Sequence, residues 1–246
     1  MRASLGTALI VIGMTASLLG IATVAAGIRY RHRRLMLLGR RYIVVVLLAS
    51  IGAFVVMENA LFAHDFSLQY VANNVARATP GLYTFTAAWA ALQGSILLWA
   101  LALSVYVAVT SWRFRARATD PIVAWATLVQ LAVLLFFFAL MLFAANPFKQ
   151  VSGTVPLDGA GPNPLLQNHP LVAIHPPMLY LGYVGFTIPF SLRSRRSLPV
   201  DSAKAGSPTC GGRRWSRGGS SPSASCSGLG GATRCSVGAG SGAGIP

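Results

Sequence analysis

Long uninterrupted runs of apolar residues constrain this chain more than any other feature. Five stretches approach or exceed the roughly 20 apolar residues that a helix needs to cross about 30 Å of hydrocarbon. They cover residues 5–28, 42–63, 84–112, 122–145 and 171–190. Only 10% of the 246 residues are charged, whereas about a quarter are charged in a soluble domain. The sequence excludes a soluble enzyme and predicts an all-α, polytopic transmembrane helical bundle of about five spans.

The fifth stretch differs from the others because it is short and contains Pro176, Pro177 and Pro189. Proline lacks a backbone donor and biases the residue before it towards extended backbone. We therefore expect irregular backbone where this stretch begins, with His175 in extended geometry. Such backbone is tolerated at membrane depth where protein covers it or where it lines a cavity.

Basic residues gather in alternate loops, which predicts the topology. The arginine-rich loops contain Arg29, Arg31, Arg33, Arg34, Arg40 and Arg41, then Arg113, Arg115 and Arg117, then Arg193, Arg195 and Arg196, whereas the other two loops contain Arg77 and Lys149. The positive-inside rule places the arginine-rich loops in the cytoplasm, and the N-terminus and the other two loops outside. The first stretch is too long for a cleaved signal peptide, and we expect it to remain as a helix.

The net charge of +15 suggests two classes of partner. A basic excess can indicate nucleic-acid binding, but these arginines stand at the ends of apolar runs. We therefore expect membrane lipid, and no nucleic acid, as the partner of this charge. The three cysteines, Cys210, Cys226 and Cys235, are confined to the last part of the chain, so a disulfide or cysteine-based metal site is excluded before residue 210.

The composition changes at Ser191. Residues 191–246 are rich in Gly, Ser, Arg and Pro, and two explanations are open. One is an authentic, disordered cytoplasmic tail. The other is out-of-frame translation, because a shifted frame permits a further apolar span followed by a Trp-rich string. We divide the chain into a membrane domain, 1–190, and this low-complexity tail, 191–246; the nucleotide sequence decides between the two explanations.

Two segments stand above generic membrane composition. The first, residues 80–99, reads PGLYTFTAAWAALQGSILLW. Its Trp89 and Trp99 suit an aromatic belt at the membrane surface, and Gly94 and Ser95 let helices approach closely. Belt and packing together account for this composition without any further function.

The second segment combines a polar loop, residues 158–170, with the sequence IHPPMLYLGYVGF at residues 174–186. It brings His175 to the level where water meets hydrocarbon. Imidazole is the usual proximal ligand of haem iron, and an ordinary histidine is mostly neutral at pH 7. Tyr180, Tyr183 and Phe186 would suit a flat macrocycle. A purely structural role for an interfacial histidine is the alternative.

At these two segments the chain resembles the CcmF/NrfE family of cytochrome c-type biogenesis proteins, within a haem-handling superfamily that includes CcsA and CcmC. The resemblance rests on NPLLQ from Asn163, on HPPMLYLGYVGF from His175, on GSILLW from Gly94, and on NPF from Asn146. It covers roughly residues 1–190. Two departures stand out: Gln93 replaces an acidic residue found in many members, and the family's Trp-rich external domain is absent as translated. The shifted-frame string ends Trp-Gly-Trp-Asp-Pro and resembles the start of that domain.

The resemblance implies a haem lyase subunit in the bacterial inner (plasma) membrane, with its haem site facing the periplasm. Its partners would be the haem chaperone, the thiol-handling subunits of the cytochrome c maturation system, and apocytochrome c. Its cofactors would be b-type haem and haem in transit to apocytochrome c, whose Cys-x-x-Cys-His thiolates supply the nucleophiles. No catalytic residue is assigned to this chain, which as translated is expected to be inactive.

By the same resemblance, His175 matches the first of two external histidines proposed to ligate haem iron. The residues expected to contact haem with it are Pro176, Pro177, Tyr180, Tyr183, Trp89 and Trp99. Haem or small-molecule transport, and a structural scaffold in a cytochrome assembly complex, are the alternative functions.

The other candidate residues have weaker claims. His169 lies in the loop and is not expected to be the ligand, His64 is expected to be an interfacial residue, and His32 a solvated base. A carboxylate inside an apolar stretch is costly and marks a functional position. Glu58 is such a residue, and we expect it either to pair with a neighbouring helix or to be protonated.

Overall fold

A computed structural model describes residues 1–163 and 170–197, and this part of the chain is mostly helical. Its elements are α1 (Arg2–Arg29), α2 (Arg33–Phe62), α3 (Gln69–Asn74), α4 (Gly81–Thr86), the 3₁₀ turn η1 (Ala87–Trp89), α5 (Leu92–Arg113), the 3₁₀ turn η2 (Arg115–Arg117), α6 (Pro121–Phe143), α7 (Leu171–Gly185) and α8 (Thr187–Ser197). The β-pairing among these residues is one isolated antiparallel bridge, Leu68 to Gln150. The predicted all-α class is confirmed.

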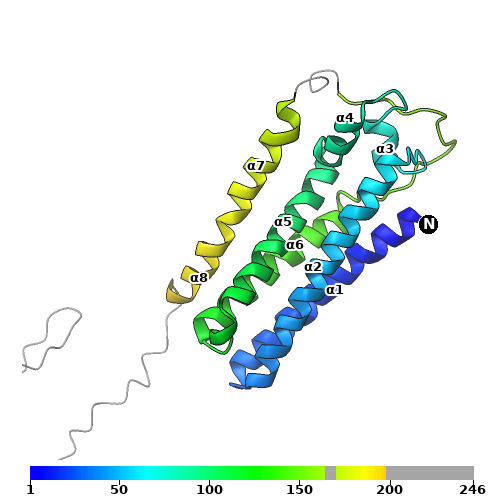
Figure 1. Ribbon diagram of the computed structural model, residues 1–246. Coiled ribbons are helices and arrows are strands. Elements are labelled where there is room, and N and C mark those ends of the chain that lie inside the picture. Colours follow the sequence, from blue (N-terminus) through cyan, green and yellow to red (C-terminus); the bar gives the residue numbers. More distant parts are fainter. Residues whose placement is uncertain (164–169, 198–246) are drawn as a thin grey trace, which may run out of the picture. The chain divides into compact units, whose positions relative to one another are not determined.

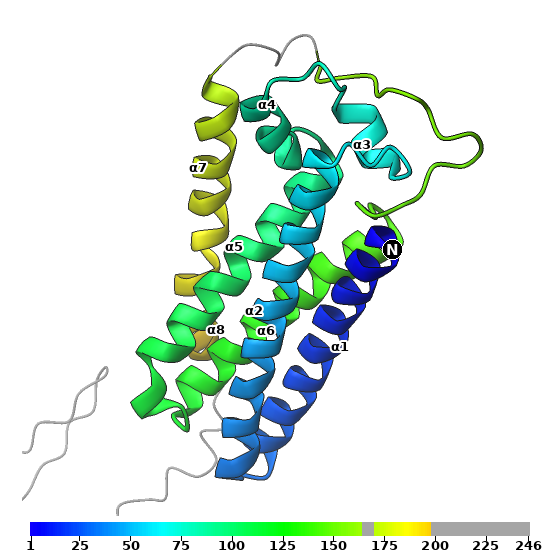
Figure 2. The ribbon, with the colours of Figure 1, turned by 45° about the vertical axis from the view of Figure 1, so that its right-hand side comes forward.

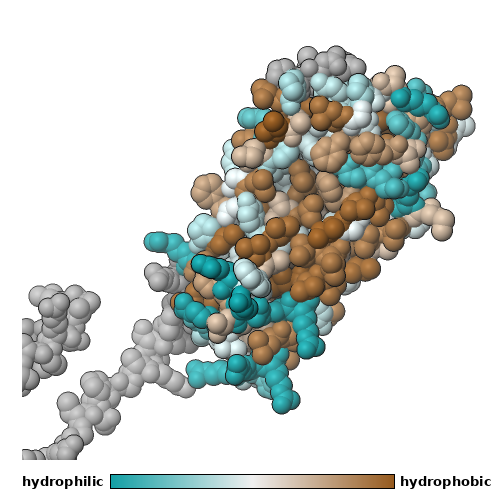
Figure 3. Space-filling view, in the orientation of Figure 1, coloured by the Kyte–Doolittle hydropathy of each residue, from teal (hydrophilic) through white to brown (hydrophobic). Residues whose placement is uncertain are grey.

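Five helical segments in the described residues are long and apolar enough to cross a membrane. Four are α1, α2, α5 and α6, and the fifth runs through α7 and α8 from Leu171 to Ser194. Figure 3 shows hydrophobic surface over the middle of the helices, with hydrophilic residues gathered towards their ends. The prediction of five spans is thus confirmed.

Successive long helices run in opposite directions (Figures 1 and 2). The N-terminus, α3, α4 and the start of α7 lie at one end, which we call the loop end. The turn between α1 and α2 and the turn between α5 and α6 lie at the other, which we call the arginine end. The arginine-rich and arginine-poor loops of the sequence therefore fall at opposite ends of the helices.

Small residues let α1 pack closely against its neighbours. A Cβ atom added at Gly6 would collide with the ring of Phe148, and one added at Gly13 with the ring of Phe138. Both phenylalanine side chains are almost fully buried. Glycine at these helix positions allows close approach, as is common in helix packing within membranes.

Two helices end on a residue in the left-handed region. After α1, Arg31 has φ of 50°, and after α2, His64 has φ of 50°. The next amide then bonds back to the helix: His32 N–H to the Gly27 carbonyl at 3.0 Å, and Asp65 N–H to the Ala60 carbonyl at 3.0 Å. This is the Schellman arrangement, in which glycine is the usual left-handed residue.

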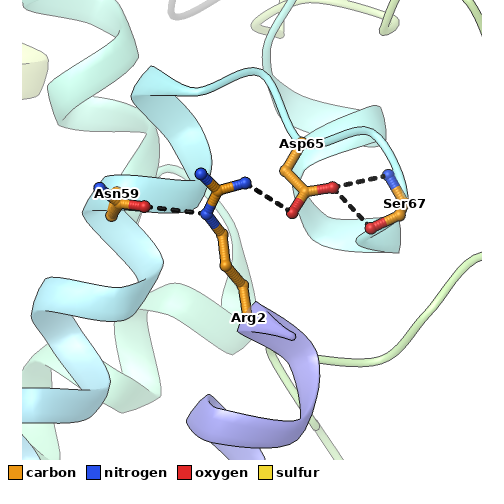
Figure 4. Close-up of polar contacts among 4 residues, drawn as sticks. All are labelled: Arg2, Asn59, Asp65 and Ser67. Carbon is orange, nitrogen blue, oxygen red and sulfur yellow. Dashed lines mark hydrogen bonds and ion pairs between the residues drawn. The ribbon is translucent and has the colours of Figure 1, made fainter.

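The N-terminus of α1 is tied to the end of α2 by a polar cluster at the loop end (Figure 4). Arg2 donates from Nε to Asn59 Oδ1 at 2.8 Å and from a terminal nitrogen to Asp65 Oδ2 at 3.1 Å. The other oxygen of Asp65 accepts from the Ser67 hydroxyl at 2.6 Å. Desolvation would raise the pKa of Asp65, but the hydrogen bonds from Ser67 and Arg2 outweigh it and lower that pKa.

Segment 144–163 folds back onto α3 at the loop end. Gln69 N–H donates to the Lys149 carbonyl at 2.9 Å, and Val151 N–H donates to the Ser67 carbonyl at 3.0 Å. Further along, Asp158 Oδ1 accepts from the backbone of Arg77 at 2.8 Å, and this bond holds the pKa of Asp158 below its ordinary value. The loop that leads to α7 is therefore anchored.

The fifth stretch departs from the sequence prediction. Pro176 and Pro177 lie inside α7, so the expectation of extended backbone at His175 is wrong. The helix continues through α8 to Ser197 and crosses the boundary placed after residue 190. Within α8, Ser191 is fully buried and its hydroxyl accepts a hydrogen bond from Gln130 of α6 at 2.9 Å. Most of the tail, 198–246, lies outside the described residues.

The third stretch also differs, since it is not one helix. It begins with α4 and η1, and α5 starts only at Leu92, after Ala91 adopts an extended conformation with φ of −129°. The break places Trp89 in a separate turn above the long helix α5.

Candidate functional site

Helix α7 has one exposed face and one packed face. His175 is exposed, and Met178, Tyr183 and Phe186 on the same side are 63%, 66% and 71% exposed. Val172 and Val184 are buried, with Tyr180 partly buried between them. Only 6% of the residues in this span's most apolar window are buried, against 33–44% in the other four spans.

Trp89 compensates for the proline inside α7. In a regular helix the amide of residue 176 would donate to the carbonyl of Val172, but proline has no N–H. The indole Nε1 of Trp89 donates to that carbonyl instead, at 2.9 Å. This substitute donor explains in part how a helix with two internal prolines is maintained where the sequence predicts irregular backbone.

Tyr180 lies at the centre of the contact between α7 and α5. Its hydroxyl is 3.1 Å from the hydroxyl of Ser95, and its ring centroid lies 5.2 Å from that of Trp99. Trp99 in turn meets Phe137 of α6 edge-on at 5.8 Å. The aromatic side chains thus link three helices, and their contacts bury Tyr180 on the side of α7 that faces away from His175.

The break between η1 and α5 is stabilised by side-chain hydroxyls that donate to backbone carbonyls of η1. The hydroxyl of Ser95 donates to the Trp89 carbonyl at 3.0 Å, and the hydroxyl of Tyr70 in α3 donates to the Ala87 carbonyl at 2.7 Å. A Cβ at Gly94 would collide with Tyr70 and with the carbonyl of Ala88. Burial raises the pKa of Tyr70 far above its ordinary value, so its hydroxyl stays protonated as a donor.

The structure divides the predicted site residues between two places. Trp89, Trp99 and Tyr180 are brought together in the contact between α5 and α7. His175 and Tyr183 lie on the exposed face of α7, and Pro176 and Pro177 are partly buried beside them. His169 lies outside the described residues.

The other candidate residues lie on segments other than α7, the helix that carries His175. His32 is the exposed residue that precedes α2, and His64 follows α2 with its ring edge towards Phe66 at 6.1 Å. Both carboxylate oxygens of Glu58 in α2 are buried and have no hydrogen-bond partner among the described residues. One of the two expectations for Glu58 is that it pairs with a neighbouring helix. It forms no such pair with a described side chain.

Sequence reasoning missed the parts played by Tyr70 and Tyr106. Tyr70 reaches under η1 from α3, and the hydroxyl of Tyr106 in α5 donates to the Leu181 carbonyl of α7 at 3.1 Å. For Tyr70 the sequence gives a partial signal, because Gly94 indicates a place where another segment packs closely against α5. The sequence does not identify Tyr70 as the residue that packs there. No such signal accompanies Tyr106.

The described residues contain no group of three or more His, Cys, Asp or Glu side chains that could hold a metal ion by themselves. A metal at His175 would therefore need its other ligands from elsewhere. The site offers one imidazole on an apolar, accessible helix face, held in place by aromatic contacts behind it.

Comparison with known proteins shows the family to which the chain is related. Residues 89–195, which include Trp89 and His175, match the cytochrome C assembly protein family. The cytochrome c-type biogenesis protein CcmF of Escherichia coli K12 is 35% identical over 187 residues, which cover 73% of this chain and 28% of that protein. NrfE of Haemophilus influenzae, also a cytochrome c-type biogenesis protein, is 36% identical over 129 residues, 52% of this chain and 20% of the relative.

A solved structure gives the same result. The structure of the cytochrome c haem lyase CcmF matches with a TM-score of 0.64 and 30% identity, over 80% of this chain and 31% of that one. The chain spans less than a third of the length of these relatives. The sequence and structural matches agree, and the chain belongs to the CcmF/NrfE family of cytochrome c-type biogenesis proteins.

Proposed function

We propose that this chain is the haem-facing membrane module of a cytochrome c maturation protein, and that His175 would hold haem iron. The observation that carries the proposal is the position of His175 on the exposed face of α7, inside the segment that matches the cytochrome C assembly family. A histidine buried in helix packing would not be accessible to a large ligand.

The residues around His175 fit such a ligand. Histidine is the usual proximal ligand of haem iron, so the single imidazole of His175 would suffice to hold the group from this side. Met178, Leu179 and Phe186 supply apolar surface beside it. Gly182 lies two helical turns after His175, and no atom lies within 4 Å of a Cβ added there. The absence of a side chain at Gly182 leaves this face flat enough for a macrocycle.

The chain's own residues would bind and orient the ligand. When bound, haem supplies the iron centre and the vinyl groups that react with the thiols of apocytochrome c. His175 would hold the iron, with Tyr183, Pro176 and Pro177 beside it. Trp89, Trp99 and Tyr180 would act as positioning residues, because their contacts hold α7 against η1 and α5.

The topology completes the proposal. We infer that the arginine end lies in the cytoplasm, since arginine-rich loops remain inside. The loop end and His175 then face the periplasm of a bacterial inner membrane. There the module would meet a haem chaperone, the thiol-handling subunits of the maturation system, and apocytochrome c, with b-type haem and haem in transit as its cofactors.

A haem titration tests the ligand assignment. The purified 246-residue chain in detergent should develop a Soret band with added haem, and His175→Ala should weaken that band severalfold. His32→Ala removes an exposed histidine at the arginine end and should leave the band unchanged. Equal bands for the wild type and His175→Ala would refute the assignment. A chain that stays colourless but still purifies with partner subunits would favour a structural scaffold, which the large exposed apolar face of α7 also suits.

The orientation has its own test. His175→Cys, in a chain whose three native cysteines are serine, should react with a membrane-impermeant maleimide from the periplasmic side of intact cells. Reaction only after the cells are opened would place the site on the wrong face and refute the proposed haem delivery.

A further inference from the structure

We propose that a pocket at the arginine end binds the phosphate headgroup of an anionic phospholipid. The pocket lies between the turn that joins α1 to α2 and the start of α6, and it is an open cavity of about 720 Å³. It is far in the fold from His175, so this inference does not depend on the proposed haem function.

The lining of the pocket combines cationic and apolar side chains. Arg31 and Arg33 contribute guanidinium groups, and Thr119 contributes a hydroxyl. The remaining lining residues are Ile28, Met36, Pro121 and Trp125. Guanidinium groups bind phosphate through paired hydrogen bonds, and the apolar residues offer a surface for the glycerol and acyl portions of a lipid. This combination favours a lipid over free phosphate.

No described carboxylate neutralises the charges of these two arginines. Neither Arg31 nor Arg33 forms an ion pair within the described residues. The nearby carboxylate of Asp120 is already engaged, because it pairs with Arg117 at 2.7 Å and accepts from the Ile122 amide at 2.9 Å as the cap of α6. Arg40 offers a contrast, since it hydrogen-bonds Ser111 at 2.9–3.0 Å.

The backbone at Arg31 supports a role for its side chain. Arg31 occupies the left-handed position of the turn with φ of 50°, where glycine would avoid the steric cost that a Cβ incurs. An observed non-glycine residue at such a position is a basis for a functional hypothesis. Here the arginine side chain at that position is one of the walls of the pocket.

This backbone geometry allows an unusually clean test. Arg31→Gly removes the guanidinium while relieving the strained conformation, so the variant should fold at least as well as the wild type. Combined with Arg33→Gln, it removes both cationic walls. His64→Gly is the matched backbone control, because His64 has the same φ of 50° in the equivalent turn at the other end.

Native mass spectrometry of the delipidated full chain measures binding directly. With phosphatidylglycerol and phosphatidylcholine offered together, the wild type should retain phosphatidylglycerol preferentially. Each arginine near an anionic headgroup contributes about fivefold in affinity, so Arg31→Gly/Arg33→Gln should lower retention about 25-fold. His64→Gly should leave it unchanged, and millimolar inorganic phosphate should not displace the lipid.

A charge control separates a site from a diffuse field. Arg34→Gln/Arg115→Gln removes two exposed arginines at the same end that do not line the pocket, and it should retain the lipid preference. An equal loss in this control and in the pocket variant would overturn the proposal, as would displacement of the lipid by inorganic phosphate.

Discussion

The indole of Trp89 donates a hydrogen bond to the carbonyl of Val172 at 2.9 Å, four residues before Pro176. Trp89 therefore occupies the place of a backbone donor that the sequence of α7 lacks. The two residues are 83 positions apart in the chain, so the contact couples the conformation of the η1 turn to the helix that carries His175.

Trp89→Phe should destabilise α7 specifically. It keeps an aromatic ring but leaves the buried Val172 carbonyl without its donor, which costs about 1–3 kcal/mol. We expect faster hydrogen exchange in residues 171–185 and a lower unfolding temperature in detergent. Trp99→Phe is the matched control, because the Nε1 of Trp99 has no hydrogen-bond partner among the described residues, and it should cost less.

A double-mutant cycle tests the cause. Pro176→Ala restores a backbone N–H that can donate to the Val172 carbonyl, so it should rescue much of the loss in the Trp89→Phe background. Strictly additive free energies for the two substitutions would contradict the compensation described here.

Gly94→Ala and Gly182→Ala should have opposite outcomes. An added Cβ at Gly94 collides with the Tyr70 hydroxyl and the Ala88 carbonyl, whereas at Gly182 nothing lies within 4 Å. Overpacking of this kind costs about 1–3 kcal/mol or more, so Gly94→Ala should lower the unfolding temperature and Gly182→Ala should not.

A larger residue at Gly182 tests the exposed face of α7. Gly182→Leu should leave the fold intact but weaken haem binding severalfold in the Soret titration, because the new side chain would project from the proposed ligand face. Unchanged haem binding would show that the macrocycle does not lie over Gly182.

Asp65→Asn should destabilise the chain at pH 7, and by less in acid. The pKa of Asp65 is lowered in the folded state, so its carboxylate adds stability above its unfolded pKa, about 4. That stability is lost as pH falls through the lower folded pKa. For a partly exposed ion pair the effect is about 0.5–1 kcal/mol. The difference in unfolding temperature between wild type and Asp65→Asn should therefore shrink below about pH 4; a constant difference would count against the ion pair.

The substitution Gln130→Leu should loosen α8 from α6. The amide of Gln130 donates to the buried hydroxyl of Ser191 at 2.9 Å, and leucine has a similar volume but no donor. We expect about 1 kcal/mol of lost stability and increased proteolysis after residue 190. Unchanged proteolysis would mean that this hydrogen bond does not hold α8.

The spans could be predicted from the sequence because length and hydropathy suffice to identify a membrane helix. Which side of each helix packs against its neighbours could not be predicted. Helix α6 is apolar on nearly every side, and lipid tails are as apolar as the helix interface, so hydrophobic periodicity does not separate the two faces.

The candidate residues could be named from the sequence, but their arrangement could not be predicted from it. His175 is identified by its motif, yet the separation of His175 from Tyr180 follows only from the helix through Pro176 and Pro177. Local propensity predicts extended backbone there. A tertiary contact from Trp89 overrides it, and a contact between residues so distant in sequence has no local signature.

The attachment of α7 along a single edge has a consequence for assembly. Its polar contacts with α5 and η1 all come from the packed side, through Trp89, Ser95 and Tyr106. A neighbouring helix or an incoming cargo molecule could dock on the opposite side without breaking any of these bonds. Occupation of the exposed side would therefore leave the hydrogen bonds that hold α7 as they are.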